Sequence, residues 1–224
     1  MNSLTEENYL KALYHLVNEN DEVSVNDLSR QLNIKMPSVN SMVKKFAEKN
    51  WVKYESYKPI KLTESGKKEA SLIVRKHRLT EMFLVEKMGF GWENVHEIAE
   101  QLEHIHSDEF FDKMDEILNY PKMDPHGEPI PDKDGNVIQP DHKKLSKCKE
   151  NQTVELASGT TSSEEFLNFL NKRDLSLGTK LKILQIEGFD QSMLIAYNGS
   201  EENFSKTVCE RLLVKELFDL NTFL

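Results

Sequence analysis

The chain has few cysteines, no long apolar run and no glycine-rich phosphate loop, and each of these absences excludes a class of protein. Its 224 residues include only two cysteines, Cys148 and Cys209, which stand far apart and outside any Cys-x-x-Cys motif. The sequence therefore supports neither a disulfide framework nor a cysteine zinc site. No apolar run approaches the roughly 20 residues that a membrane-spanning helix needs, and the N-terminus shows no cleavable signal pattern. We expect a soluble, reduced, cytoplasmic protein without a membrane partner.

Positive charge is also scarce in the chain as a whole. Lys and Arg total 29 against 38 Asp and Glu, which gives a formal net charge of −9 at pH 7. Because phosphate contacts need clustered cations, this deficit at first argues against nucleic acid. The distribution reverses that argument, since Lys35–Lys68 holds nine lysines and three acidic residues, a local excess of six. One basic segment in an acidic chain favours a specific docking face, and a solvated helix face is the alternative.

The first 62 residues combine helical and strand patterns. Apolar spacing predicts a helix around Leu10–Val17, a short helix from the Ser24 cap to Asn33, and a third helix from Pro37 to about Asn50. Trp51–Tyr54 and Ile60–Leu62 are then typical of two strands joined by a turn. This order predicts a winged helix-turn-helix whose third helix is the recognition helix. Three amphipathic helices without the hairpin would more often be a small bundle, and the basic hairpin favours DNA binding.

Candidate DNA contacts follow from this arrangement. In a major groove, the early polar side chains of the third helix would reach base edges, and the lysines around them would lie near phosphates. No preferred base sequence can be deduced from these residue types. The candidates for binding a double-stranded operator are Lys35, Pro37, Ser38, Asn40, Ser41, Lys44, Lys45 and, in the hairpin turn, Lys58.

Longer helices and then a second β-rich region follow. Thr63 is placed to cap a fourth helix running to about Met88, and further helices are expected from about Glu93 to Ile105 and from Asp108 to Leu118. Five of the seven prolines fall in 120–150, which predicts a long ordered loop.

The last third of the chain shows strand patterns in place of the long helical ones. A helix over Glu164–Asn171 and strands over Lys180–Ile186 and Ser192–Tyr197 predict a small β domain of the barrel type. The chain as a whole is therefore expected to be mainly α with small β parts, in three domains over 1–70, 71–150 and 151–224.

Histidine and glutamate gather in the fourth and fifth expected helices. His77 and Glu81 stand four residues apart, so both would project from one helix face and could bind one ion. On a continuous fifth helix, His96 and Glu100 would share one arc with Glu103, His104 and Ser107, beside an apolar stripe. Such a sulfur-free donor set fits Mn(II) or Fe(II) and would also bind Zn(II), Co(II) or Ni(II). The alternative is a surface stripe of weak ion pairs.

With these motifs in hand, the chain resembles the DtxR/MntR family of metal-dependent transcriptional repressors over essentially its whole length. The resemblance implies a homodimeric repressor of metal-uptake genes from the three-domain branch, with a winged helix-turn-helix, a helical metal-binding and dimerisation domain, and a C-terminal SH3-like domain of the FeoA type. The motifs that carry it are Leu4–Leu10, Met36–Val39, Lys76–Glu81, Glu103–Asp108, Pro125–Pro131 and Leu177–Leu181.

The resemblance also implies two sets of metal ligands. Iron-responsive relatives carry a sulfur ligand where Glu100 stands, so its carboxylate favours Mn(II). Relatives place Asp or Met where Asn8 stands, and Glu7 is the alternative donor at that place. The implied primary site is Asn8, Glu100, Glu103 and His104, and the implied ancillary site is His77, Glu81 and His96, extended by Asp124, His126 and, from the third domain, Glu165.

Two other functions stay open from the residues alone. A winged-helix regulator with a non-metal effector would bind DNA whether or not a chelator is present. A metal-handling or hydrolytic enzyme would lose turnover on chelation and would not bind DNA. The chain has neither a His-Glu-x-x-His motif nor a nucleophile elbow, so catalysis and a small-molecule substrate are not expected.

Overall fold

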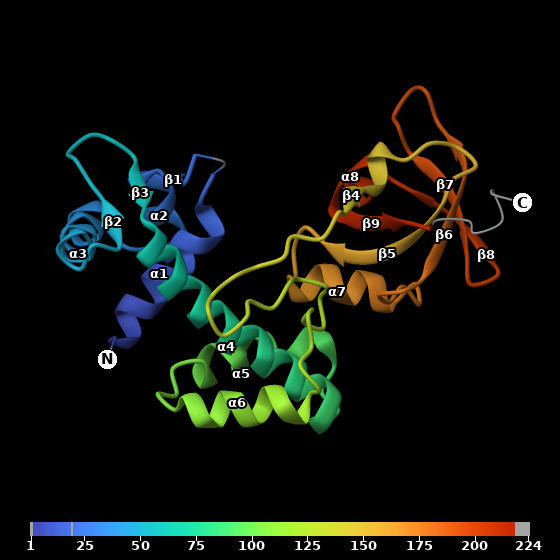
Figure 1. Cartoon of the computed structure of the whole chain (residues 1–224). Helices are drawn as coiled ribbons and strands as arrows, with labels where there is room; N and C mark the ends of the chain where they lie inside the picture. Colours follow the sequence, from blue (N-terminus) through green and yellow to red (C-terminus); the bar gives the residue numbers. More distant parts are fainter. Residues whose placement is uncertain (1, 19, 218–224) are drawn as a thin grey trace, which may run out of the picture. The chain divides into compact units, whose positions relative to one another are not determined.

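The computed structural model describes residues 2–18 and 20–217, which form two compact units (Figure 1). Unit 1 takes its residues from 1–89, 96–122 and 129–138, and unit 2 from 90–95, 123–128 and 139–224. Within the described residues, no helix is both long enough and apolar enough to cross a bilayer. Both cysteines are free and buried in unit 2.

The N-terminal part of unit 1 is a winged helix. Its elements are α1 (Leu4–Leu16), β1 (Glu22–Val23), α2 (Val25–Leu32), α3 (Met36–Glu48), β2 (Val52–Lys53) and β3 (Ile60–Leu62). Ser3 and Glu6 form a capping box that begins α1, and Asn33 in the left-handed region ends α2. The expected order of helices and hairpin is confirmed. The sheet order β1-β3-β2 includes β1, which is too short to show a strand pattern in the sequence.

Apolar faces of these helices share one core. Leu10 and Leu13 of α1, Leu28 of α2 and Phe46 of α3 are fully buried, together with Ile60 of the wing. The basic surface of α3 is left outside this core, because the apolar positions follow one helical stripe. The core therefore fixes α3 with its polar side available to a partner.

Three further helices complete unit 1. The long helix α4 (Glu64–Met88) contacts α1, α5 (His96–Leu102) and α6 (Asp108–Ile117) (Figure 1). Gly66 lets α4 start close to the wing, since a Cβ there would lie 1.9 Å from the Trp51 carbonyl oxygen. A smaller apolar cluster around Leu79, Phe111 and Met114 holds α4 and α6 together.

The helix expected from about Glu93 to Ile105 is shorter than predicted. Only His96–Leu102 is α-helical, and the 3-10 turn η1 (Trp92–Asn94) precedes it in unit 2. The chain must turn before α6, whose first turn is capped by Ser107, and the bond from Ile105 N–H to the Leu102 carbonyl tightens that exit. The single helical arc predicted for His96 through Ser107 is therefore wrong beyond Leu102.

Unit 2 contains an antiparallel sheet with the strand order β4-β9-β5-β6-β7-β8. Its core includes Leu156, Leu181, Ile183, Ile195 and Phe204. The hydrogen-bonded order leaves an open, SH3-like arrangement rather than a closed barrel. Its elements are β4 (Lys143–Lys144), η2 (Leu145–Lys147), β5 (Thr153–Gly159), α7 (Glu164–Asn171), β6 (Lys180–Ile186), β7 (Met193–Tyr197), β8 (Ser200–Phe204), α8 (Lys206–Arg211) and β9 (Leu212–Glu216).

Candidate metal centre and DNA-binding surface

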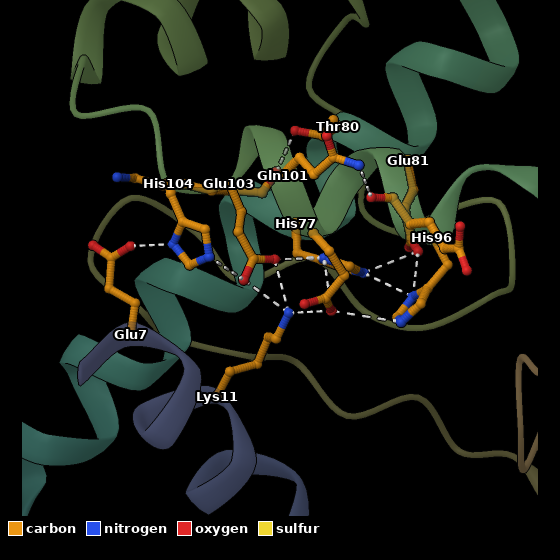
Figure 2. Close-up of polar contacts among 12 residues, drawn as sticks. Glu7, Lys11, His77, Thr80, Glu81, His96, Gln101, Glu103 and His104 are labelled. Atoms are coloured by element: carbon orange, nitrogen blue, oxygen red, sulfur yellow. Dashed lines mark hydrogen bonds and ion pairs between the residues drawn. The ribbon is translucent and has the colours of Figure 1, made fainter. Parts of the chain in front are cut away.

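His77 of α4 lies at the centre of the polar cluster in unit 1 (Figure 2). Its Nδ1 donates to Glu103 Oε2 at 2.6 Å, and its Nε2 donates to Glu81 Oε1 at 3.0 Å. Burial opposes the charged ring, but the two carboxylates outweigh burial and raise the pKa of His77 to about 9. The protonated His77 ring therefore lies between two carboxylates. Binding of a metal ion to these residues would require the ring to lose a proton, because a metal binds the neutral imidazole.

His77, Glu81 and His96 form one group of potential ligands. His96 Nδ1 lies 3.2 Å from His77 Nε2 and 3.3 Å from Glu81 Oε1. One ligand atom from each of the three falls within 4.8 Å of the others. The i, i+4 spacing on α4 places His77 beside Glu81, and the start of α5 brings His96 to them. The structure thus gathers the three residues expected for the ancillary site.

His77 also belongs to a second group, with Glu100 and Glu103. Glu103 is completely buried, and its pKa is lowered because the hydrogen bond from His77 and the charge of Lys11 outweigh the burial that would raise it. His96 Nε2 lies 3.5 Å from Glu100 Oε1, so the two groups are contiguous. The sequence analysis assigned His77 to the ancillary set only. In the structure, His77 contacts Glu81 of that set and also Glu103 of the expected primary set.

Glu7 of α1 binds His104 directly. His104 Nδ1 donates to Glu7 Oε2 at 2.5 Å, and His104 Nε2 lies 3.8 Å from Glu103 Oε1 (Figure 2). Glu7 is buried, as is common only for a carboxylate with a partner. The first turn of α1 is thereby joined to the segment after α5.

Asn8, the residue after Glu7, carries an unsatisfied polar atom. Its Oδ1 is buried and has no hydrogen-bond partner. A buried acceptor without a partner is costly, and such atoms in native proteins commonly point to an absent ligand or ion. An amide oxygen is a ligand type suited to Mn(II) or Fe(II), so the donor chemistry at this place fits such a metal.

The remaining proposed ligands belong to unit 2. Asp124 Oδ1 accepts hydrogen bonds from the backbone N–H groups of His126 and Glu128, at 2.8 and 2.9 Å. His126 donates from Nε2 to the Trp92 carbonyl at 2.8 Å and stacks on the Trp92 ring. Glu165 lies exposed in the first turn of α7.

The expected DNA contacts line α3 and the wing. Lys35 precedes α3, and Pro37 stands in its first turn. Asn40 accepts a hydrogen bond from Tyr54 Oη at 3.0 Å, which ties the helix to the wing. A groove of about 440 Å³ runs between the two elements. Its lining includes Asn40, Lys44 and Lys58, while Ser38, Ser41 and Lys45 lie exposed on α3.

The sequence interpretation missed two residues that the structure places at these sites. Lys11 donates to Glu100 and Glu103, and its position three residues after Asn8 on α1 was the available signal. Tyr57 is fully exposed at the wing tip with a positive φ of 68°. Together with Lys58, Tyr57 lines the groove between α3 and the wing.

Comparisons with known proteins cover both parts of unit 1 and extend into unit 2. Residues 1–60 match the model described as the iron dependent repressor N-terminal DNA binding domain, and residues 63–132 match that of its metal binding and dimerisation domain. The iron-dependent repressor IdeR of Mycobacterium tuberculosis is 33% identical over 133 residues, which span 58% of this chain and 58% of IdeR.

Solved structures match over a greater length. A manganese-dependent transcriptional repressor in complex with manganese is 30% identical with a TM-score of 0.84, covering 95% of this chain and 100% of that one. ScaR with bound Zn²⁺ is 31% identical with a TM-score of 0.76, covering 95% of this chain and 99% of ScaR. The chain therefore belongs to the family of iron- and manganese-dependent transcriptional repressors, the DtxR/MntR family that its motifs resemble.

Proposed function

We propose that this protein is a metal-dependent DNA-binding repressor of metal-ion uptake and homeostasis genes, working in the cytoplasm where its operator DNA lies. The observation that carries the proposal is the convergence of nitrogen and oxygen donors from α4, from α5 and from Glu103 just after α5, in a chain with a basic winged helix. Its similarity to repressors that depend on iron and manganese supports the same reading.

The proposed ligands keep the two expected sets. The sulfur-free donors favour Mn(II) or Fe(II), and Zn(II), Co(II) and Ni(II) would also bind in vitro. A bound divalent ion supplies charge neutralisation and a cross-link among its donors. The primary set is Asn8, Glu100, Glu103 and His104, with Glu7 as the alternative to Asn8, and the ancillary set is His77, Glu81 and His96, with Asp124, His126 and Glu165 of unit 2 as further candidates.

The first turn of α1 gives the switch its physical basis. Glu7 accepts a hydrogen bond from His104, and the next residue, Asn8, carries a buried Oδ1 without a partner. The neighbouring Glu6 accepts from Lys49, the residue that caps the end of α3, at 2.5 Å. Fixing this turn on the cluster lowers the conformational freedom that would oppose docking of α3 on DNA. Metal affinity and operator affinity must then rise together, because coupling between two binding sites is reciprocal.

We further propose a homodimer that docks two recognition helices in successive major grooves, about 34 to 36 Å apart. The matched model that covers α4 to α6 describes a dimerisation domain. Helix α6 supports this assignment, because Phe110 and Ile117 stand seven residues apart on one face and remain exposed in the single chain.

The test is operator binding with and without metal. Duplexes selected from a random pool by the Mn(II)-loaded protein would be bound in fluorescence anisotropy at fixed salt, first in EDTA and then with Mn(II) or Fe(II). Tight binding only with metal, lost in Glu103→Ala and retained in Glu109→Ala on the exposed start of α6, supports the proposal. Equal binding in EDTA would contradict it and would favour a regulator with a non-metal effector.

A further inference from the structure

Lys11 lies inside the group of carboxylates to which the metal is assigned. Its ammonium donates to both Glu103 oxygens, at 2.8 and 2.9 Å, and also to Glu100. The side chain is only 12% exposed, and Figure 2 shows it reaching from α1 to Glu103. A lysine can bury its apolar stem in this way while its charged end meets the carboxylates. This ion pair is not a surface contact, because the Glu103 side chain is completely buried.

The Lys11 ammonium and a divalent ion would bind the same carboxylate oxygens of Glu100 and Glu103. Glu100 and Glu103, with His77, are the residues whose ligand atoms converge within 4.8 Å. Two like charges this close repel strongly where the surroundings are buried and the effective dielectric constant is low. An ion bound to both carboxylates therefore excludes the ammonium from its present place.

We propose that Lys11 is a built-in cation of the Glu100–Glu103 pair, which a divalent ion must displace in order to bind there. This rests on the proposed function, since it takes these carboxylates as metal ligands. Lys11 lowers the affinity of the site for metal and so sets the metal concentration at which the repressor responds. A competitor that is part of the chain acts at a fixed local concentration, independent of the ionic composition of the cell.

The exchange also changes which turn of α1 is held. With Lys11 on Glu103, the second turn of α1 is fixed to the segment after α5. Displacement of Lys11 passes that attachment to Asn8, three residues earlier, whose buried Oδ1 lacks a partner. The attachment point moves toward the first turn, which carries Glu6 and its link to α3.

The test measures Mn(II) affinity of the full chain by isothermal titration calorimetry. Lys11→Met is expected to bind Mn(II) at least about tenfold more tightly, within the usual range of coupling between competing ligands. Lys11→Arg, which keeps the cation, should stay near the wild type. Lys180→Met, which removes the same charge from exposed β6 in unit 2, is the control and should not change affinity. Unchanged or weaker binding in Lys11→Met overturns the inference.

A second measurement uses the wild-type protein and does not depend on the stability of any variant. Acetylation by acetic anhydride, read by mass spectrometry, should become several-fold faster at Lys11 when Mn(II) is added, because the displaced amine reaches solvent. Unchanged or slower acetylation would overturn the inference. Glu103→Gln separates the proposed metal site from the proposed competition by Lys11. If this variant keeps the wild-type Mn(II) affinity, the proposed primary site is wrong. If only the Lys11 variants fail to show the expected change, the competition is wrong and the primary site still stands.

Discussion

At the scale of the residue, unit 1 is unusual in burying complete charged pairs. Arg75 and Asp115 form an ion pair with both side chains less than a tenth exposed. Arg75 also donates to the Pro131 carbonyl at 2.8 Å, so the guanidinium has partners on α6 and on the proline-rich loop. Removing one member of such a pair leaves a buried charge without compensation, which costs more than the pair itself contributes.

We therefore expect Arg75→Met to lower the free energy of unfolding by about 3 to 5 kcal/mol, because Asp115 is left unpaired and buried. Urea unfolding followed by circular dichroism measures the change. Lys113→Met breaks the exposed pair with Glu116 and should leave the midpoint unchanged. If Arg75→Met lowers the free energy of unfolding only slightly, Asp115 must reach water or another partner.

Residue identities predicted local geometry better than tertiary contacts. The i, i+4 relation of His77 and Glu81 gave a contact that the structure shows at 3.0 Å. The hydrogen bond between Glu7 and His104 connects residues that are 97 positions apart, so helical spacing could not predict it. The same holds for Lys11, whose role depends on how α1 packs against α4.

At the scale of the element, the start of α1 is fixed to α3 by one carboxylate. Glu6 completes the capping box by accepting from Ser3 N–H at 2.9 Å, and it pairs with Lys49 at 2.5 Å and Lys45 at 3.1 Å. Burial alone would raise its pKa, but the hydrogen bonds from Lys49 and Ser3 lower the pKa of Glu6 to about 2. The first turn of α1 is therefore held to α3 and to the residue that caps it.

For Glu6→Gln we predict a loss of about 1.5 to 3 kcal/mol in unfolding free energy, the usual worth of hydrogen bonds to a charged group. Metal should also improve operator affinity less than in the wild type, because α1 and α3 are no longer tied. Denaturant unfolding and anisotropy with and without Mn(II) check the two parts. Glu48→Gln, an exposed carboxylate on α3, is the control. Undiminished coupling in Glu6→Gln would show that another contact carries the signal.

Some element boundaries were predictable from the pattern of apolar residues alone. The helix over Glu164–Asn171 and the strand over Lys180–Ile186 have the predicted bounds. The strands β1, β4, β5, β8 and β9 were not predicted, and it is their pairing with neighbouring strands that places them in the two sheets. The fifth helix was predicted too long because helical spacing continues past Leu102, whereas the chain turns there before α6 begins.

At the scale of the whole molecule, the residues that the structure describes form three apolar clusters, and the sequence predicts three domains. One holds α1 to α3 and the wing, one joins α4 and α6, and the third fills the sheet of unit 2. The first two lie in a single compact unit, so the division at residue 70 stays a prediction. The acidic composition and the basic winged helix together indicate that charge distribution, rather than net charge, decides the partner.

The proposed dimer makes its own prediction. Phe110→Glu with Ile117→Glu places two carboxylates on the exposed face of α6 and should convert the dimer to monomer, because charge on an apolar interface is costly to desolvate. Sedimentation equilibrium reads the state directly. Ile138→Glu makes the same change at another exposed apolar residue of unit 1 and should leave the dimer intact. A dimer that survives the double change would place the interface elsewhere.

The central claim is that metal and operator DNA bind to one coupled switch, and reciprocity tests it most directly. Mn(II) affinity would be measured by titration calorimetry for the free protein and for its complex with the selected operator, and operator affinity would be measured with and without Mn(II). The account predicts that the two ratios are equal and exceed about fivefold, the lower end of typical allosteric coupling. An Mn(II) affinity that is the same with and without operator would contradict it.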